Sequence, residues 1–130
     1  MAHGKEEIPV RVRVARKSLH VERTFGQNIT DFQLVYLKSE EVAQELLRRL
    51  GLEDLEFRTI GIKIRFKNFE TYTRERSLTD YSNKLDPILS TTRMLLKEFE
   101  GRSTPVRLIG IVASHLRAIT RGPSSLDSWV

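Results

Sequence analysis

The stretch RTIGIKIRFKNFETYTRERSL, residues 58–78, is the most informative part of the chain because its first half alternates strictly between apolar and polar residues. Successive side chains of a strand point to opposite faces of a sheet, so this period of two predicts a strand with one buried and one solvated face. The apolar positions are Ile60, Ile62, Ile64 and Phe66, and the polar or small positions are Thr59, Gly61, Lys63, Arg65 and Lys67. The segment therefore predicts the first arm of a β-hairpin.

A two-residue turn at Lys67–Asn68 would join this arm to a second strand that ends near Leu78. Directly opposed residues share a face, so this turn pairs Phe66 with Phe69 and thereby fixes the register of the hairpin. The outer pairs would be Lys63 with Tyr72, Arg65 with Glu70, Gly61 with Arg74 and Thr59 with Arg76. We therefore expect an outer surface rich in cations with one aromatic residue, and Glu75 directed toward the core side.

The segments on either side of the hairpin predict one strand and one helix each. The first strand, 17–25, places Leu19, Val21 and Phe25 on one face and Ser18, His20, Glu22 and Thr24 on the other. Apolar residues at helical spacing predict a first helix that begins at Asp31 or Ser39 and ends at Gly51, and a second that begins at Asp86–Pro87 and ends before Gly101. The apolar run 105–116 predicts a central strand.

The order strand, helix, strand, strand, helix, strand is typical of an α+β fold. We expect a ferredoxin-like βαββαβ domain in which a four-stranded antiparallel sheet carries both helices on one face. The domain would span residues 17–118. Residues 1–16 would be an extended basic connector, and residues 119–130 a flexible polar tail.

The composition favours an acidic partner and excludes several classes of chemistry. Lysine and arginine outnumber aspartate and glutamate by 22 to 17, which leaves a net charge of +5. A basic balance of this kind suits nucleic acid. The chain has no cysteine, so disulfides and thiolate chemistry are excluded, and a cytoplasmic location is expected. No run approaches the roughly 20 apolar residues of a membrane span.

No catalytic or metal-binding pattern stands out. The histidines His3, His20 and His115 lack metal-ligand spacing, and paired carboxylates fall where a helix start and a loop are expected. We therefore predict no catalytic residues, no metal site and no cofactor in this domain. The outer sheet face mixes cations with hydroxyls and could bind phosphate oxygens, although antiparallel sheets often carry such residues on a merely solvated face.

Three blocks of sequence resemble one known family. The segment KSLHVERTF, residues 17–25, is similar to a KSxxxERTF segment; residues 58–78 are similar to RTVTLKIRYxDFxTxTRSRTL; and PVRLIG, residues 105–110, is similar to PVRLLGV. In that order and spacing the blocks resemble the little finger domain of Y-family translesion DNA polymerases of the DinB type. Residues 4–14 resemble the stretch that joins the thumb to the little finger, so the resemblance implies an excised domain with Met1–His3 added to it.

The resemblance implies a non-catalytic domain that grips primer-template DNA, while the parent polymerase would use Mg²⁺ held by carboxylates of its palm. The matched motifs assign DNA binding to Lys17, Ser18, Glu22, Thr24, Thr73, Arg74, Arg76, Ser77 and Arg107, and Lys63 and Arg65 join them through their place on the outer face. Glu22 would repel phosphate, so we expect it to orient a cation or cap an amide. Arg74→Ala and Arg76→Ala are expected to weaken duplex binding for all sequences alike.

The tail 125–130, SLDSWV, resembles a degenerate sliding-clamp peptide with Leu126 and Trp129 as its apolar anchors, and the resemblance assigns clamp binding to Leu126, Trp129 and Val130. An inert tail is the alternative. For the domain itself, the alternatives are an RNA- or single-strand-binding module and a small ferredoxin-like enzyme. A base-stacking sheet would show aromatic residues on its central strands, and the outer face offers only Tyr72.

Overall fold

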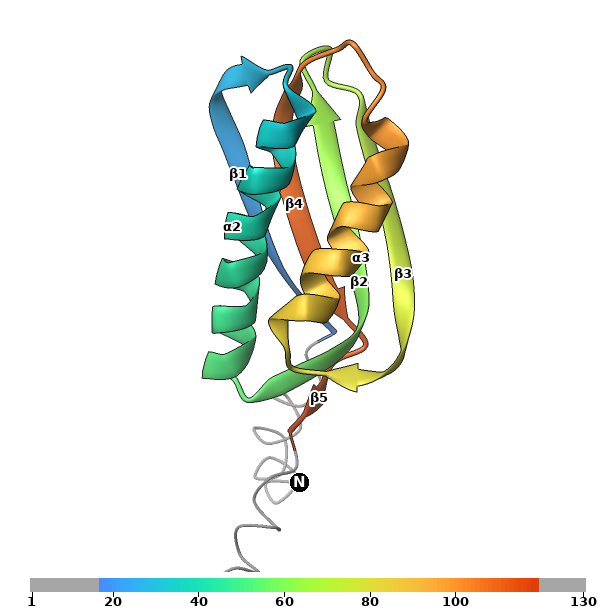
Figure 1. The fold of residues 1–130 in the computed structure, drawn as a ribbon. Coiled ribbons are helices and arrows are strands. Elements are labelled where there is room, and N and C mark those ends of the chain that lie inside the picture. Colours follow the sequence, from blue (N-terminus) through green and yellow to red (C-terminus); the bar gives the residue numbers. More distant parts are fainter. Residues whose placement is uncertain (1–16, 120–130) are drawn as a thin grey trace, which may run out of the picture.

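Two helices lie side by side on one face of an antiparallel sheet in a computed structural model that describes residues 17–119 (Figure 1). The predicted connector 1–16 and residues 120–130 of the predicted tail, which include Leu126, Trp129 and Val130, lie outside the described residues. Within residues 17–119, no helix is long and apolar enough to cross a membrane.

The elements follow the predicted βαββαβ order, which is confirmed. They are β1 (Ser18–Ile29), α2 (Phe32–Leu52), β2 (Leu55–Phe66), β3 (Thr71–Ser82), α3 (Leu85–Leu96) with the 3-10 turn η1 (Lys97–Phe99), β4 (Val106–Ser114) and the short β5 (Arg117–Ala118). The strand order is β1-β4-β2-β3, and β5 pairs with the start of β2. The run 105–116 thus forms an inner strand, as its continuous apolar character predicts.

Both helices begin close to the predicted places, and the N-cap is one of the two predicted residues in α2 but a different residue in α3. Asp31 caps α2 by accepting a hydrogen bond from the Gln33 amide at 3.0 Å, whereas Ser39 is buried inside the helix. Lys84 occupies the N-cap of α3 and makes no side-chain cap bond, so the prediction that Asp86 caps this helix is wrong. Asp86 lies in the first turn instead, where a carboxylate still interacts favourably with the helix dipole.

The core lies between the sheet and the two helices. The predicted apolar face of β2 is buried throughout, from Ile60 to Phe66 at alternate positions, and meets Leu46 of α2 and Ile88 of α3 in one cluster. The helices thus shield only one face of the sheet from water. The other side carries no helix (Figure 1) and is the open face of the domain.

The β2–β3 hairpin differs from the prediction by one residue. Three residues, 67–69, connect the strands, because the Phe66 amide donates to the Glu70 carbonyl at 2.9 Å and Phe69 adopts a left-handed φ of 69°. A three-residue loop with a left-handed third residue is the next most common hairpin after the two-residue turn. The register is consequently Arg65 opposite Thr71 and Ile64 opposite Tyr72.

This shift exchanges the two faces of β3. Tyr72, Arg74 and Arg76 pair with Ile64, Ile62 and Ile60 and therefore lie on the helix side of the sheet. The prediction that they line the outer surface is wrong. Thr71, Thr73, Glu75 and Ser77 take their place on the open face, and Glu75, predicted to face the core side, is exposed there.

Candidate nucleic-acid interface

The open face consists of four rows of residues that run across β1, β4, β2 and β3. The rows are Ser18, Ser114, Thr59 and Ser77; His20, Val112, Gly61 and Glu75; Glu22, Gly110, Lys63 and Thr73; and Thr24, Leu108, Arg65 and Thr71. Short hydroxyls are the most frequent side chains, and the charged ones are two cations and two carboxylates, beside one histidine. The open face is thus hydroxyl-rich rather than rich in cations throughout.

Glycines form the floor of the middle rows. A Cβ on Gly110 would lie 3.0 Å from Glu22 Cγ, and one on Gly61 would lie 3.2 Å from the Arg74 carbonyl oxygen and 3.3 Å from Glu75 Cβ. Both glycines are buried, and neighbouring atoms already occupy the space that a side chain would need at these two positions. Glycine inside a strand often marks a place where another backbone approaches closely.

Cations gather at the end of the open face near the β2–β3 turn. Lys63 donates to Glu22 Oε2 at 3.0 Å, and Arg65 donates from Nε to Thr71 Oγ1 at 2.9 Å. Arg107 lies at an irregularity of the β2–β4 pairing, between the Leu108–Arg65 and Val106–Phe66 pairs, and is exposed. We call Lys63, Arg65 and Arg107 the basic end.

The opposite end of the open face is built from hydroxyls. Thr59 is almost fully buried, and its Oγ1 lies 2.8 Å from Ser77 Oγ and 2.6 Å from His115 Nδ1. Ser18 and Ser114 continue this row on the neighbouring strands. Such groups can either donate or accept, so this end can present hydrogen-bond donors to an anion without adding charge.

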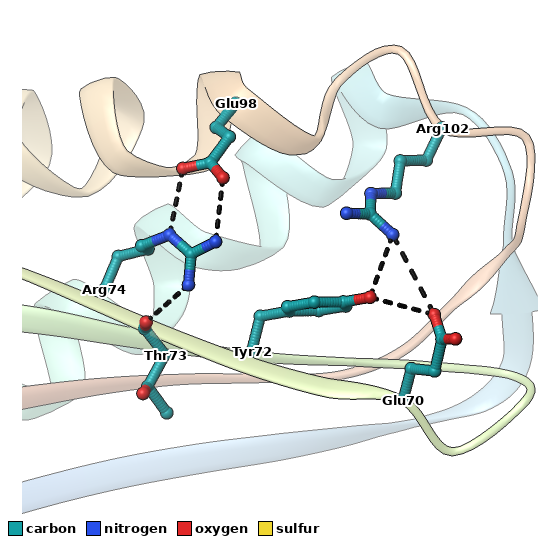
Figure 2. Close-up of polar contacts among 6 residues, drawn as sticks. All are labelled: Glu70, Tyr72, Thr73, Arg74, Glu98 and Arg102. Atoms are coloured by element: carbon teal, nitrogen blue, oxygen red, sulfur yellow. Dashed lines mark hydrogen bonds and ion pairs between the residues drawn. The ribbon is translucent and has the colours of Figure 1, made fainter.

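Arg74 is engaged on the helix side of the sheet (Figure 2). Its Nε and Nη2 donate to the two carboxylate oxygens of Glu98 at 3.0 and 2.8 Å, and its Nη1 donates to the Thr73 carbonyl at 2.8 Å. The hydrogen bonds from Arg74 hold the pKa of Glu98 below its ordinary value, so the pair is ionised at neutral pH. All three nitrogens of this guanidinium therefore have partners within the domain.

A second arginine, Arg102, lies beside Arg74 over the same aromatic residues. Its Nη1 donates to Tyr72 Oη at 3.2 Å and lies 3.9 Å from Glu70 (Figure 2), and its guanidinium is 4.5 Å from the Tyr72 ring centroid. Both guanidinium groups also lie within 5.4 Å of the Phe99 ring. No sequence pattern predicts this cluster, because Arg102 and Phe99 follow the second helix and no alternation relates them to β3.

The structure brings most of the predicted DNA-binding residues together. Ser18, Glu22, Thr24, Lys63, Arg65, Thr73 and Ser77 share the open face, Arg107 lies at its basic end, and Lys17 directly precedes β1. Arg74 and Arg76 are separated from them by the sheet itself. Among residues 17–119, no group of three histidine, aspartate or glutamate side chains could hold a metal ion.

Comparisons with known sequences connect this geometry to one family. The model of the impB/mucB/samB family C-terminal domain matches residues 16–128. DNA polymerase IV of Halorhodospira halophila is 34% identical over 116 residues, which cover 89% of this chain and 33% of that protein. DNA polymerase IV of Exiguobacterium sibiricum is 32% identical over 118 residues, or 91% of this chain and 32% of that protein. The chain thus spans about a third of these relatives.

Solved structures share the fold. The complex of the beta-clamp processivity factor with the little finger domain of PolIV contains a chain that is 27% identical, with a TM-score of 0.62 over 75% of this chain and 86% of that one. DinB from Sulfolobus solfataricus matches with a TM-score of 0.67 over 79% of this chain and 29% of that one. At 13% identity, the second likeness concerns the fold alone.

Proposed function

We propose that this chain, which belongs to the impB/mucB/samB family of C-terminal domains, binds the phosphate backbone of primer-template DNA. It is a little finger domain of the Y-family DNA polymerase type, as its resemblance to the DinB motifs predicts. A function in DNA binding then requires a surface on this fold that fits a phosphodiester backbone.

The observation that carries the proposal is the basic end beside a glycine floor. Lys63, Arg65 and Arg107 supply positive charge, while Gly61 and Gly110 add no side chain of their own to the middle rows. Hydroxyls on both sides of this floor complete a set of donors for phosphate oxygens. Contacts of this kind fix the position of a protein on a duplex without reading its sequence.

A sheet that binds single strands or RNA by stacking is less favoured. Such a sheet stacks bases on aromatic side chains of its central strands, and no row residue from the central strands β4 and β2 is aromatic, while the one aromatic ring in the rows, His20, lies on the edge strand β1. Tyr72, the one aromatic residue predicted for this surface, lies on the helix side. A duplex is therefore the ligand that this surface favours.

The parent protein would be a DNA-directed polymerase that copies damaged templates, since the curated relatives are DNA polymerases IV and this chain corresponds to about a third of them. Its catalytic carboxylates and the Mg²⁺ that they would hold belong to the palm of such a chain. The fragment itself would not be catalytic.

We also propose a second partner, a sliding clamp, bound through Leu126, Trp129 and Val130 of the tail. The support is the SLDSWV motif together with the solved complex of a PolIV little finger with the beta-clamp. The double variant Leu126→Ala/Trp129→Ala should lose affinity for an immobilised clamp and keep its affinity for DNA. Unchanged clamp binding would exclude this role of the tail.

Fluorescence anisotropy of a labelled primer-template duplex, measured over a range of salt concentrations, tests the main proposal. Removal of one cation that binds a phosphate should lower the slope of log affinity against log salt by about 1. Arg65→Ala and Arg107→Ala should each have this effect, whatever the DNA sequence. Arg48→Ala on α2 removes an equal charge from an exposed position paired with Glu45, and serves as the matched control.

Three outcomes would contradict the proposal. The slope of the Arg48→Ala control could fall as far as that of the Arg65→Ala variant, which would mean that only the net charge matters. A single strand or an RNA hairpin of equal charge could bind more tightly than the duplex, which would favour the alternative module. Finally, a failure of every probe to bind even at low salt would leave the open face as a solvated surface.

A further inference from the structure

Phe69, at the tip of the β2–β3 hairpin, combines exposure with an unfavourable backbone conformation. It is 69% exposed, and its φ of 69° lies in the left-handed region that bulky side chains rarely adopt. Glycine or asparagine is the usual residue at this position of a three-residue hairpin loop. Because most of the ring remains in water, burial does not offset the conformational cost, and an outlier of this kind suggests a function.

The tip is held firmly by backbone hydrogen bonds. The Phe69 amide donates to the Phe66 carbonyl at 2.8 Å, and the Lys67 amide donates to the Pro105 carbonyl at 2.9 Å, which ties the turn to the segment before β4. Thr71 Oγ1 also approaches the Phe69 carbonyl at 3.4 Å. The ring therefore projects from an ordered support, and binding to it would require little further ordering of the backbone.

Two arginines lie near the hairpin tip. The Arg107 guanidinium lies 5.5 Å from the Phe69 centroid, and Arg65 is linked to the tip through its hydrogen bond to Thr71. Glu70, the nearest carboxylate in sequence, is directed instead toward Tyr72 and Arg102 (Figure 2). An exposed aromatic ring bordered by cations is the combination that binds single-stranded nucleotides, with stacking on the base and charge pairing to the phosphates.

We infer that Phe69 stacks against an unpaired base next to the duplex that the open face grips. This inference rests on the proposed DNA-binding function and adds to it a contact with bases. The position of Phe69 supports this contact with a base, because the hairpin tip directly follows the end of β2 that carries Lys63 and Arg65. A protein partner for this ring would be favoured by neighbouring exposed apolar side chains, whereas the exposed neighbours here, Lys67, Asn68, Glu70 and Arg107, are all polar or charged.

The experiment compares three labelled duplexes of equal phosphate count: one blunt, one with a single-stranded overhang, and one with the same overhang made of abasic sugar-phosphate units. The two overhangs carry equal charge, so any difference between them reports the bases. The wild-type chain should bind the normal overhang about fivefold or more tightly than the abasic one, as one stacked base allows.

Two variants of one residue separate stacking from folding. Phe69→Asn suits the left-handed conformation, so the domain should stay as stable as the wild type while its preference for the normal overhang disappears. Phe69→Tyr keeps a stacking ring and the backbone conformation, and should keep the preference. Thermal unfolding of both variants checks that the fold is intact.

Two results would overturn the inference and leave the proposed function standing. Either the wild type binds the normal and the abasic overhang equally while it still binds the blunt duplex, or Phe69→Asn keeps the full preference for bases. The first result would show that no base is contacted, and the second that another residue contacts it. Failure of the wild type to bind any of the three duplexes would instead reject the proposed function and this inference together.

Discussion

Lys63 Nζ donates a hydrogen bond to Glu22 Oε2 at 3.0 Å across Gly110, which lies between them on the open face. Both side chains are about one third exposed, at 31% and 35%. Glu22 therefore reduces the positive charge of the basic end and would repel an approaching phosphate. Glu22→Gln is expected to tighten duplex binding by up to about fivefold at low salt, measured by anisotropy.

Glu41→Gln is the matched control for this change. It also removes one carboxylate, but from α2, where Glu41 pairs with Arg23 away from the open face. The control should leave binding nearly unchanged. Weaker binding by Glu22→Gln than by the wild type would show that orienting Lys63 matters more than the repulsion by the carboxylate.

Gly110 gives a prediction about packing on the same surface. A Cβ at this position would lie 3.0 Å from Glu22 Cγ, so Gly110→Ala should destabilise the domain by roughly 1 kcal/mol through overpacking. In a Glu22→Ala background the crowded atom is gone, and the same change should instead stabilise by about 0.5 kcal/mol because alanine restricts the unfolded chain. Urea unfolding of the four proteins measures this coupling. Equal effects in both backgrounds would mean that Glu22 is not the obstacle.

The sequence predicts the elements and the buried faces of this fold well because both depend on periodicity. The alternation of β1 and β2 places Glu22 and Lys63 on the open face correctly, and the unbroken apolar run marks β4 as an inner strand. Such patterns do not contain the order of the strands in the sheet, since that order depends on which neighbouring position each helical connection leads the chain to.

The register of β3 shows where periodicity fails. The strand 71–82 alternates weakly, with few apolar residues on either side, so only the turn could set its register. A phenylalanine in the left-handed region gives no recognisable turn signal, whereas a glycine there would. A register error of one residue therefore predicts the wrong face for Arg74 and Arg76, which lie on the helix side, and for Glu75, which lies on the open face. The candidate site is consequently predicted well on β1 and β2, and poorly on β3.

Tyr36 of α2 gives a prediction about pH. Its hydroxyl donates to Glu100 Oε1 at 3.1 Å and its side chain is 5% exposed; burial, followed by this hydrogen bond, raises the pKa of Tyr36 to about 12. A raised pKa means that the folded state favours the neutral phenol. The resulting stability is fully present below the ordinary pKa near 10 and is lost as the pH rises from there through about 12.

An alkaline titration followed by the ultraviolet absorbance of ionised tyrosine measures this shift. The wild type should show one late ionisation near pH 12, and Tyr36→Phe should remove it. Tyr81→Phe is the control and should leave the late step in place. A late step that persists in Tyr36→Phe would assign it to another tyrosine.

Arg74 tests whether a residue that matches the family motif contacts DNA directly in this chain. Glu98 and the Thr73 carbonyl occupy its three nitrogens, so a phosphate would have to displace ionised Glu98 to reach the guanidinium. Arg74→Ala alone is therefore expected to change the salt dependence of duplex binding much less than Arg65→Ala does. Glu98→Gln should release Arg74, so that Arg74→Ala weakens duplex binding only in the Glu98→Gln background.

The measurement is the salt slope of the wild type, the two single variants and the double variant. A slope that falls by about 1 in Arg74→Ala, as the removal of one phosphate-binding cation requires, would show that DNA displaces Glu98 and that the assignment from the motif is correct despite the helix-side position of this arginine. An unchanged slope in all four proteins would exclude Arg74 from the interface, because even the released guanidinium would then fail to reach a phosphate. We expect the salt slope to depend on Arg74 only when the Glu98 carboxylate has been removed. That result would show that Glu98 keeps this arginine from DNA.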